Sequence, residues 1–312
     1  MGGSSGKIPL TIFCGKGGVG KTTLALAYAL GHANAGRNAL VVSSHPLAEL
    51  AVSVSLAGLK EKAPQAATRL FVLHIDPKEI LDQTVKKQIP SEALAGAVIS
   101  SRIYQSLIEV APGLKEMVFL GRLQHLAEQR TSDDSANKYD VVVWDAPSTG
   151  HFLQTLEVSR HFNFYLSGPF AALGKEITRF FSEATNFALL PVTTLEEMAV
   201  EETIELCEKL GGKLGMEPRG VVCNMASPLL SSGNGTAGSA AAVAALEKAA
   251  NPQLRFILDR LAVERSLFEQ LRGGVKAKPF VVERRHRMGT DLELLLELSG
   301  QLAGRLEGVA GK

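Results

Sequence analysis

Residues 15–23 carry the strongest chemical pattern in this sequence. Two lysines and two threonines stand among four glycines there, in the order Gly-Lys-Gly-Gly-Val-Gly-Lys-Thr-Thr. Glycines let a backbone curl tightly, so that successive N–H groups can point at one anion. Lys21 adds a positive charge for the β- and γ-phosphates of a nucleotide, and the Thr22 hydroxyl is a ligand for Mg²⁺. The pattern predicts a phosphate-binding loop for ATP and Mg²⁺, made of Gly15, Lys16, Gly17, Gly18, Val19, Gly20, Lys21, Thr22 and Thr23.

The flanks of this loop have the pattern that phosphate binding requires. An apolar run at residues 8–14 predicts a strand before the loop, and residues 22–35 predict a helix that Gly36 closes. A helix that starts at the loop directs its positive end at the phosphates. This strand–loop–helix order favours a phosphate site over a chance glycine-rich turn.

Short apolar runs alternate with helical patterns along the rest of the chain. Nearly continuous apolar character is typical of parallel strands that helices cover on both faces. We therefore expect an α/β fold, a three-layer P-loop NTPase with a doubly wound, mostly parallel sheet. One helix is expected at residues 195–210, closed by Gly211. The expected strands are residues 8–14, 39–43, 70–75, 139–144, 187–192, 220–224 and 279–282.

Two stretches, residues 78–130 and 152–185, interrupt this alternation with helical patterns only. The first has breaks near Pro90 and at Pro112-Gly113. We expect them to form a helical subdomain beside the sheet, inside one ATPase domain that spans residues 7–310. Residues 1–6 are predicted to be a flexible tail. The Gly/Ser/Ala-rich residues 227–242 are predicted to be a mobile loop.

The composition excludes several other classes of protein. A net charge of +1 gives no overall field that would attract nucleic acid or an anionic membrane. No apolar run approaches the roughly 20 residues of a membrane-spanning helix. The three cysteines are far apart, which argues against a disulfide framework and a zinc site. We expect a cytoplasmic protein with no integral membrane segment and no nucleic-acid partner.

A second motif narrows the class of phosphate-binding protein. The block Asp145-Ala146-Pro147-Ser148-Thr149-Gly150-His151 follows an apolar run and resembles the D-T-A-P-T-G-H signature of ArsA/Get-type ATPases. That family includes the arsenite-pump ATPase and the factor that delivers tail-anchored proteins. Further blocks agree in order, so that the resemblance covers about residues 8–306: I-D-P at 75–77, P-G-x-x-E at 112–116, V-T…E-T at 192–203 and V-V-x-N at 221–224. MinD/ParA-type positioning ATPases lack the block at Pro112 and the long helical insertion, and are the alternative.

The resemblance implies a role for each matching residue. Lys16, a second lysine early in the loop, marks the deviant form of the motif, in which this lysine reaches across a dimer interface to the partner's nucleotide. Asp145 would organise Mg²⁺ together with Thr22. Asn224 would hydrogen-bond adenine, and Pro279 and Phe280 would pack beside the base. The implied partners are ATP and either a second copy of the chain or a paralogue, because this chain contains one such loop.

The chain departs from the family at one position that matters for catalysis. Residues 43–47 read Ser-Ser-His-Pro-Leu, so His45 stands where the family has the aspartate that activates the attacking water. A neutral imidazole can accept a proton, because its reference pKa is about 6.5. We expect either slow hydrolysis or a histidine that acts as a substitute base. Two functions therefore stay open: an ATPase that cycles a client on and off, and a catalytically weak, nucleotide-dependent scaffold.

Apolar residues recur at helical spacing through both helical stretches. They either bury one another against the sheet or line a groove for an apolar protein client. Met117 is the one methionine in these stretches, which does not favour a general receptor for membrane segments. The apolar residues are Leu94, Val98, Ile103, Leu107, Ile108, Leu114, Val118, Phe119, Leu123 and Leu126, and then Phe162, Phe164, Leu166, Phe170, Leu173, Ile177, Phe180, Phe181 and Phe187.

Overall fold

The computed structural model describes residues 10–43, 59–60, 62–111, 113–129, 138–165, 169–231, 252–285 and 292–310. His45 and the predicted tail at residues 1–6 lie outside these ranges. Of the loop predicted at residues 227–242, only the beginning is described, and Pro228–Ser231 form the short helix α12 there.

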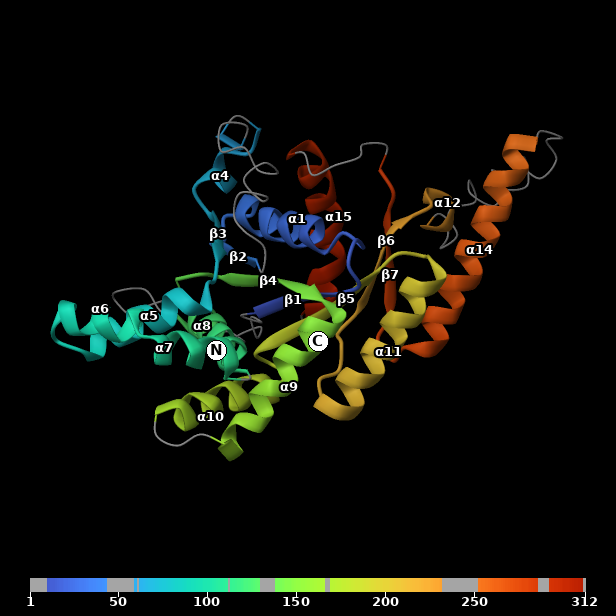
Figure 1. The fold of residues 1–312 in the computed structure, drawn as a ribbon. Helices are drawn as coiled ribbons and strands as arrows, with labels where there is room; N and C mark the ends of the chain where they lie inside the picture. Colours follow the sequence, from blue (N-terminus) through green and yellow to red (C-terminus); the bar gives the residue numbers. More distant parts are fainter. Residues whose placement is uncertain are drawn as a thin grey trace, which may run out of the picture.

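Seven strands form one sheet in the order β3-β2-β4-β1-β5-β6-β7 (Figure 1). All six neighbouring pairs are parallel, so the carboxyl ends of the strands share one edge. The strands are β1 (Leu10–Gly15), β2 (Ala39–Ser43), β3 (Leu70–His74), β4 (Val141–Ser148), β5 (Phe187–Thr193), β6 (Val221–Ala226) and β7 (Pro279–Glu283).

This sheet confirms the predicted fold class, with a strand at each of the seven expected places. β4 extends four residues beyond the expected end at Trp144. The extension stays paired with β1, where Phe13 is in register with Asp145 and Gly15 with Ser148. Asp145 therefore lies inside a central strand instead of in the loop that follows it, so its backbone is held on both sides.

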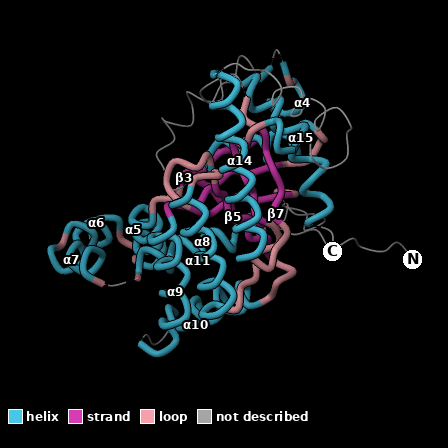
Figure 2. Tube along the Cα trace, turned by 90° about the vertical axis from the view of Figure 1, so that its right-hand side faces the viewer, coloured by secondary structure: helices cyan, strands magenta, loops and turns pink. Residues whose placement is uncertain are grey.

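Helices cover both faces of the sheet. In Figure 1, α1 (Lys21–Asn34), α4 (Pro64–Ala67) and α15 (Leu292–Ala310) lie above it. The other face carries α8 (Leu114–Glu128), α9 (Thr149–Tyr165), α10 (Pro169–Ser182), α11 (Glu197–Leu214) and α14 (Pro252–Gly274). Figure 2 shows the strands enclosed between these layers. The apolar side chains of each face pack against the helices that cover it and form a large core on each side, and a smaller third core joins β6 and β7 to α11 and α14.

The two helix ends predicted from glycines have different outcomes. Gly36 has a φ of 81° just after α1, as the closing glycine requires. The end predicted at Gly211 is wrong, because α11 continues to Leu214 and Gly215 closes it with a φ of 57°. The buried face of α11 continues through Leu206, Leu210 and Leu214. That packing outweighs the cost of about 1 kcal/mol for a glycine inside a helix.

The first helical stretch folds as α5 (Pro77–Gln88), α6 (Glu92–Ser100), α7 (Arg102–Val110) and α8, with breaks where the prolines predict them. Leu81 of α5, Ile108 of α7 and the buried face of α8 belong to the same core as the sheet. Trp144 on β4 packs against Phe119 and Phe152 at ring-centroid distances of 5.2 and 5.4 Å. Aromatic packing thus joins α8 and α9 directly to the central strand β4.

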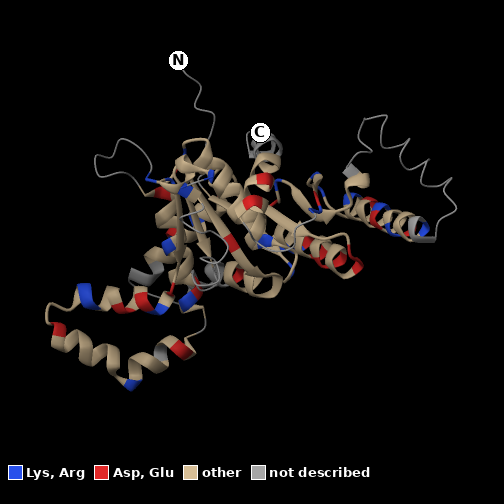
Figure 3. Cartoon of the chain, turned by 90° about the horizontal axis from the view of Figure 1, so that it is seen from above, with Lys and Arg blue, Asp and Glu red and all other residues tan. Residues whose placement is uncertain are grey.

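The helices α6 and α7 extend away from the sheet (Figure 1). They carry large apolar side chains in water, since Leu94, Ile103 and Val110 are 63%, 84% and 76% exposed. Figure 3 shows acidic and basic residues interspersed along the described helices. The apolar residues of this projection are therefore its most distinctive surface feature.

Candidate functional site

The loop at residues 15–20 joins the carboxyl end of β1 to α1. Gly15 has a φ of 134°, and a Cβ atom there would lie 2.3 Å from the Val192 carbonyl oxygen of β5. Gly20 has a φ of 90°, and a Cβ atom there would lie 2.4 Å from Asn224 Nδ2. Only glycine fits both the backbone conformation and the space at these two positions. Gly15 and Gly20 are thus required by the geometry of the loop.

Lys21 lies in the first turn of α1 with 8% of its surface exposed. Its Nζ donates a hydrogen bond to the main-chain carbonyl oxygen of Lys16 at 2.9 Å. Burial lowers the pKa of Lys21, and the charge of Asp145 opposes that shift. A buried ammonium with this neutral acceptor is well placed to take a phosphate oxygen instead.

Thr22 and Asp145 come together from different elements. The Thr22 hydroxyl of α1 donates to Asp145 Oδ2 of β4 at 2.7 Å, and Asp145 is 1% exposed. A hydroxyl and a carboxylate are the hard oxygen donors that Mg²⁺ prefers, and Mg²⁺ commonly takes one or two such protein groups besides phosphate and water. The predicted pair therefore fits a magnesium ion beside the loop.

Lys16 points back onto its own chain. Its Nζ lies 2.8 Å from Glu202 Oε2 on α11. The role expected for Lys16 requires its side chain to reach a second subunit, so this ion pair has to break for that role. Glu202 stands in the V-T…E-T block of the sequence, but nothing in that pattern predicts its contact with Lys16.

Asn224 lies at the carboxyl end of β6 and is 7% exposed. Its Nδ2 donates a hydrogen bond to the Val19 carbonyl oxygen at 2.9 Å, which links the end of β6 to the backbone of the phosphate loop. An amide has further donor and acceptor positions, so this bond is compatible with a contact to adenine. That contact stays a prediction.

Pro279 and Phe280 are not brought to the loop. They open β7 and are in register with Val221 and Val222 of β6, ahead of Asn224 on that strand. Strands rise about 3.3 Å per residue, so the two residues lie back from the carboxyl edge that carries the phosphate loop. Phe280 is half-buried and packs against the core beneath α1 and α15. At the carboxyl end of β7 stands Arg284 instead.

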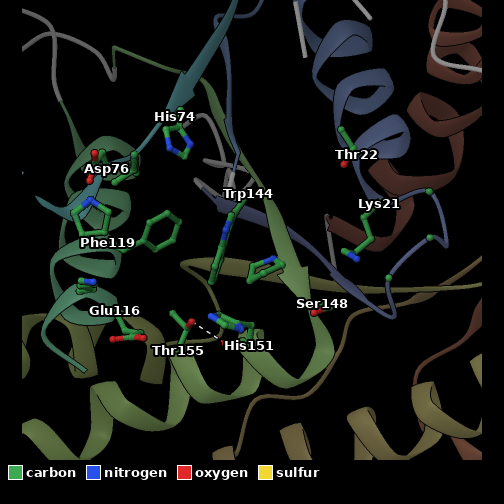
Figure 4. A pocket seen from close by; sticks show the side chains of 17 residues that line it. Lys21, Thr22, His74, Asp76, Glu116, Phe119, Trp144, Ser148, His151 and Thr155 are labelled. Carbon is green, nitrogen blue, oxygen red and sulfur yellow. Dashed lines mark hydrogen bonds between the residues drawn. The ribbon is translucent and has the colours of Figure 1, made fainter. Parts of the chain in front are cut away.

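A cavity of about 960 Å³ opens from the phosphate loop toward α8 and α9 (Figure 4). Lys21 and Thr22 lie on one side of it, and His74, Asp76, Glu116, Phe119 and Trp144 lie on the other. His151 and Ser148 of the Asp145 block also line it. His74 is the last residue of the edge strand β3, and His151 lies in the first turn of α9, which follows the central strand β4. A position at or just after the carboxyl end of a parallel strand is the signal that places them at this edge.

A second cavity of about 820 Å³ lies on the opposite side of the loop, between α11 and α14. Glu264 in its wall is 4% exposed and accepts a hydrogen bond from the Ser227 backbone N–H at 2.8 Å. Arg260 and Arg284 flank its carboxylate at 3.5 and 3.6 Å. This polar cluster has no motif in the sequence and was not predicted.

The three cysteines are buried, and Cys14 lies on β1 directly before the phosphate loop. Burial raises the pKa of Cys207 and of Cys223 to about 12 and raises that of Cys14 further. Within the described ranges, no group of three or more His, Cys, Asp or Glu side chains is arranged to hold a metal ion. Among the helices that the structure describes, none is both long and apolar enough to cross a bilayer.

Comparison with known proteins identifies relatives of this chain. The sequence model of the family described as anion-transporting ATPase matches residues 9–210, more than half of the chain. The ATPase BagA of Mycobacterium tuberculosis is 29% identical over 215 residues, which cover 65% of this chain and 61% of that protein.

Two further relatives cover smaller shares of their own length. The arsenical pump-driving ATPase of Escherichia coli is 23% identical over 255 residues, or 74% of this chain and 42% of that protein. The ATPase GET3 of Malassezia globosa is 29% identical over 173 residues, or 55% and 45%. The matches therefore span about two fifths to three fifths of these relatives.

Proposed function

This chain belongs to the anion-transporting ATPase family, and from that premise we propose that it binds Mg·ATP and uses binding and slow hydrolysis to open and close a dimer. The observation that carries this proposal is the convergence of Lys21, Thr22 and Asp145 at one end of a glycine loop. Each has the chemistry that one part of Mg·ATP requires.

The roles of these residues follow from their positions. The loop backbone and the α1 amino terminus receive phosphate oxygens, and Lys21 exchanges the Lys16 carbonyl for a phosphate oxygen. Thr22 and Asp145 hold the metal side. Mg·ATP supplies an activated phosphoryl group, whose transfer needs positioning and charge stabilisation more than covalent help.

The proposed dimer rests on Lys16 and on the resemblance to the deviant-lysine ATPases, in which this lysine reaches across a dimer interface. A lysine at the outer part of the loop, with 35% of its side chain exposed, can reach a neighbouring molecule once it leaves Glu202. A second copy of the chain or a paralogue would supply the other half.

The exposed apolar side chains of α6 and α7 support a protein client as the output of the cycle. The packing of Trp144 between Phe119 and Phe152 offers a route from Asp145 to α8 and α9. The alternative is a scaffold that closes on ATP and hardly hydrolyses it, which the histidine at position 45 favours.

Calorimetry with Mg·ATP and light scattering test the binding and the dimer. We expect saturable binding and a doubling of mass with ATP, and Lys16→Ala should retain much of the affinity but lose the doubling. A mass that is the same for wild type and Lys16→Ala would contradict the role of Lys16 across the interface.

A phosphate-release assay separates the enzyme from the scaffold. We expect wild-type turnover well below about 1 s⁻¹. Because a general base contributes about 10²–10⁴-fold, His45→Asp should recover part of that factor. Brisk wild-type turnover that falls in His45→Asp, with a rate rising through about pH 6–7, would make the histidine itself the base.

A further inference from the structure

Lys16 is held inside its own subunit by a contact that the proposed dimer has to break. Its ammonium lies 2.8 Å from Glu202 Oε2, on the second turn of α11. The two side chains are 35% and 31% exposed, so the ion pair is partly shielded from water. The ammonium is therefore drawn across the loop toward α11.

Glu202 stands where the phosphate loop, α11 and α9 meet. The hydroxyl of Thr149, the first residue of α9, is buried and makes no well-aligned hydrogen bond with any described residue. It still faces Glu202 closely enough to affect that carboxyl. Burial alone would raise the pKa of Glu202, but the contacts with Lys16 and Thr149 hold it below its usual range. Glu202 is thus an ionised group with a cation beside it.

The same residue, Lys16, also engages the second lysine of the loop. Its main-chain carbonyl accepts the hydrogen bond from Lys21 Nζ at 2.9 Å. Lys21 is thus hydrogen-bonded to the backbone of Lys16, and the Lys16 side chain is paired with Glu202. When Lys21 turns to a phosphate, one of the two bonds that hold residue 16 in place is lost.

We propose that Glu202 is a positioning residue for Lys16: it holds the Lys16 ammonium within its own subunit until nucleotide binds, and Lys16 leaves it to reach a second subunit. This inference rests on the proposed function, since it needs a nucleotide-dependent dimer. It adds a residue outside the loop that sets how readily the dimer forms.

The expected size of the effect follows from the exposure of the pair. Ion pairs with this much solvent contact contribute about 0.2–1 kcal/mol, which corresponds to a factor of roughly 1.4–5. A symmetric dimer releases two such pairs. Removing the carboxylate should therefore strengthen nucleotide-dependent dimerisation by roughly 2- to 25-fold.

Sedimentation velocity in a saturating concentration of Mg·AMP-PNP measures the dimer dissociation constant. We expect Glu202→Gln to lower it by that factor and Glu202→Asp, which keeps the charge, to lie nearer to wild type. Glu201→Gln is the matched control, because Glu201 is an exposed carboxylate on the same turn of α11. A dissociation constant unchanged in Glu202→Gln overturns the inference.

A double-mutant cycle shows whether Glu202 acts through Lys16. In a Lys16→Ala background, which is expected to lose nucleotide-dependent dimerisation, adding Glu202→Gln should not restore the dimer, since no ammonium remains to be released. If the same strengthening appears in both backgrounds, Glu202 acts by another route and the inference fails.

A measurement without nucleotide separates this inference from the proposed function. Acetylation of the Lys16 amine, followed by mass spectrometry, should be roughly 2- to 5-fold faster in Glu202→Gln than in wild type. Equal rates overturn the contact itself. Failure of wild type to bind Mg·AMP-PNP in calorimetry would instead overturn the proposed function, whatever the acetylation rates are.

Discussion

The two halves of the carboxyl edge of the sheet follow the sequence motifs to different degrees. At the β1–β4 half, Lys21, Thr22 and Asp145 converge as the motifs predict. At the β6–β7 half, Asn224 supports the loop from below, while Pro279 and Phe280 open a strand away from it. A contiguous motif determines its local backbone conformation by itself. The position of a single residue assigned by resemblance depends instead on where its strand begins and on the register with the neighbouring strand.

The polar groups of the β6–β7 half come from segments without a recognisable pattern. Glu264 lies on α14, and Arg284 follows β7. They approach the loop only because the strand order places β6 and β7 beside β5. Mutations in the two halves should therefore separate phosphate binding from effects on the loop or on stability.

The largest effect on nucleotide binding is expected for Lys21→Ala, in the β1–β4 half. It removes a partly desolvated ionic hydrogen bond to phosphate and should weaken Mg·ATP binding by about 2–4 kcal/mol, roughly 30- to 1000-fold in calorimetry. Lys276→Ala is the control, because that lysine lies at the protein surface in an ion pair with Glu217. Unchanged affinity in Lys21→Ala would contradict the phosphate-loop assignment.

A smaller loss is expected for Asp145→Asn, confined to the metal-dependent part of binding. The amide keeps the size of the side chain but weakens the acceptor that faces Thr22 and Mg²⁺. Affinity for Mg·ATP should fall by about 10- to 100-fold, while affinity measured in EDTA changes little. Equal losses with and without magnesium would show that Asp145 stabilises the loop and not the metal.

Asn224→Ala tests the hydrogen bond that joins β6 to the phosphate loop. Loss of its bond to the Val19 carbonyl should weaken Mg·ADP and Mg·GDP alike, by about 3- to 10-fold. Any further loss with ADP alone measures the adenine contact that the family resemblance implies. Asn186→Ala removes a comparable amide bond, to the Phe180 carbonyl, and is the control. Full affinity for both nucleotides in Asn224→Ala would contradict the supporting role.

At the β6–β7 half, Phe280→Ala should change stability and not binding. Phe280 is half-buried in the core beneath α1 and α15, so we expect a loss of about 1–3 kcal/mol in urea denaturation. Nucleotide affinity should stay within about twofold, and the same holds for Pro279→Ala. A tenfold loss of affinity in either variant would mean that the base does reach the start of β7.

The buried cysteine in each half should be unreactive toward alkylation in the folded chain. Cys14 ends near the phosphate loop and Cys223 lies on β6, and burial raises the pKa of both thiols. Neither should react with iodoacetamide at pH 8 in the folded chain, although both should react in urea. Because the unfolded thiols lose their protons first, stability should fall as the pH rises above about 8.5. Rapid labelling of the folded chain would contradict the burial.

The amino-acid sequence alone determined the fold class, the seven strands and the phosphate half of the site. Alternating apolar runs, the glycine loop and the Asp145 block are local patterns, and each of them fixes a local backbone shape. The sequence also identified His45 as a departure from the family that we expect to slow hydrolysis. His45 lies outside the described residues, so this expectation stays a prediction.

Only the tertiary structure decided which residues meet across elements. The ion pair between Lys16 and Glu202 joins residues 186 positions apart, and Asn224 supports Val19 over 205 positions. The register of β7 places Pro279 and Phe280 at the start of that strand, back from the carboxyl edge, and continued packing carries α11 past Gly211. These outcomes depend on strand order, register and burial, which are properties of the assembled sheet and its helices rather than of any short stretch of residues.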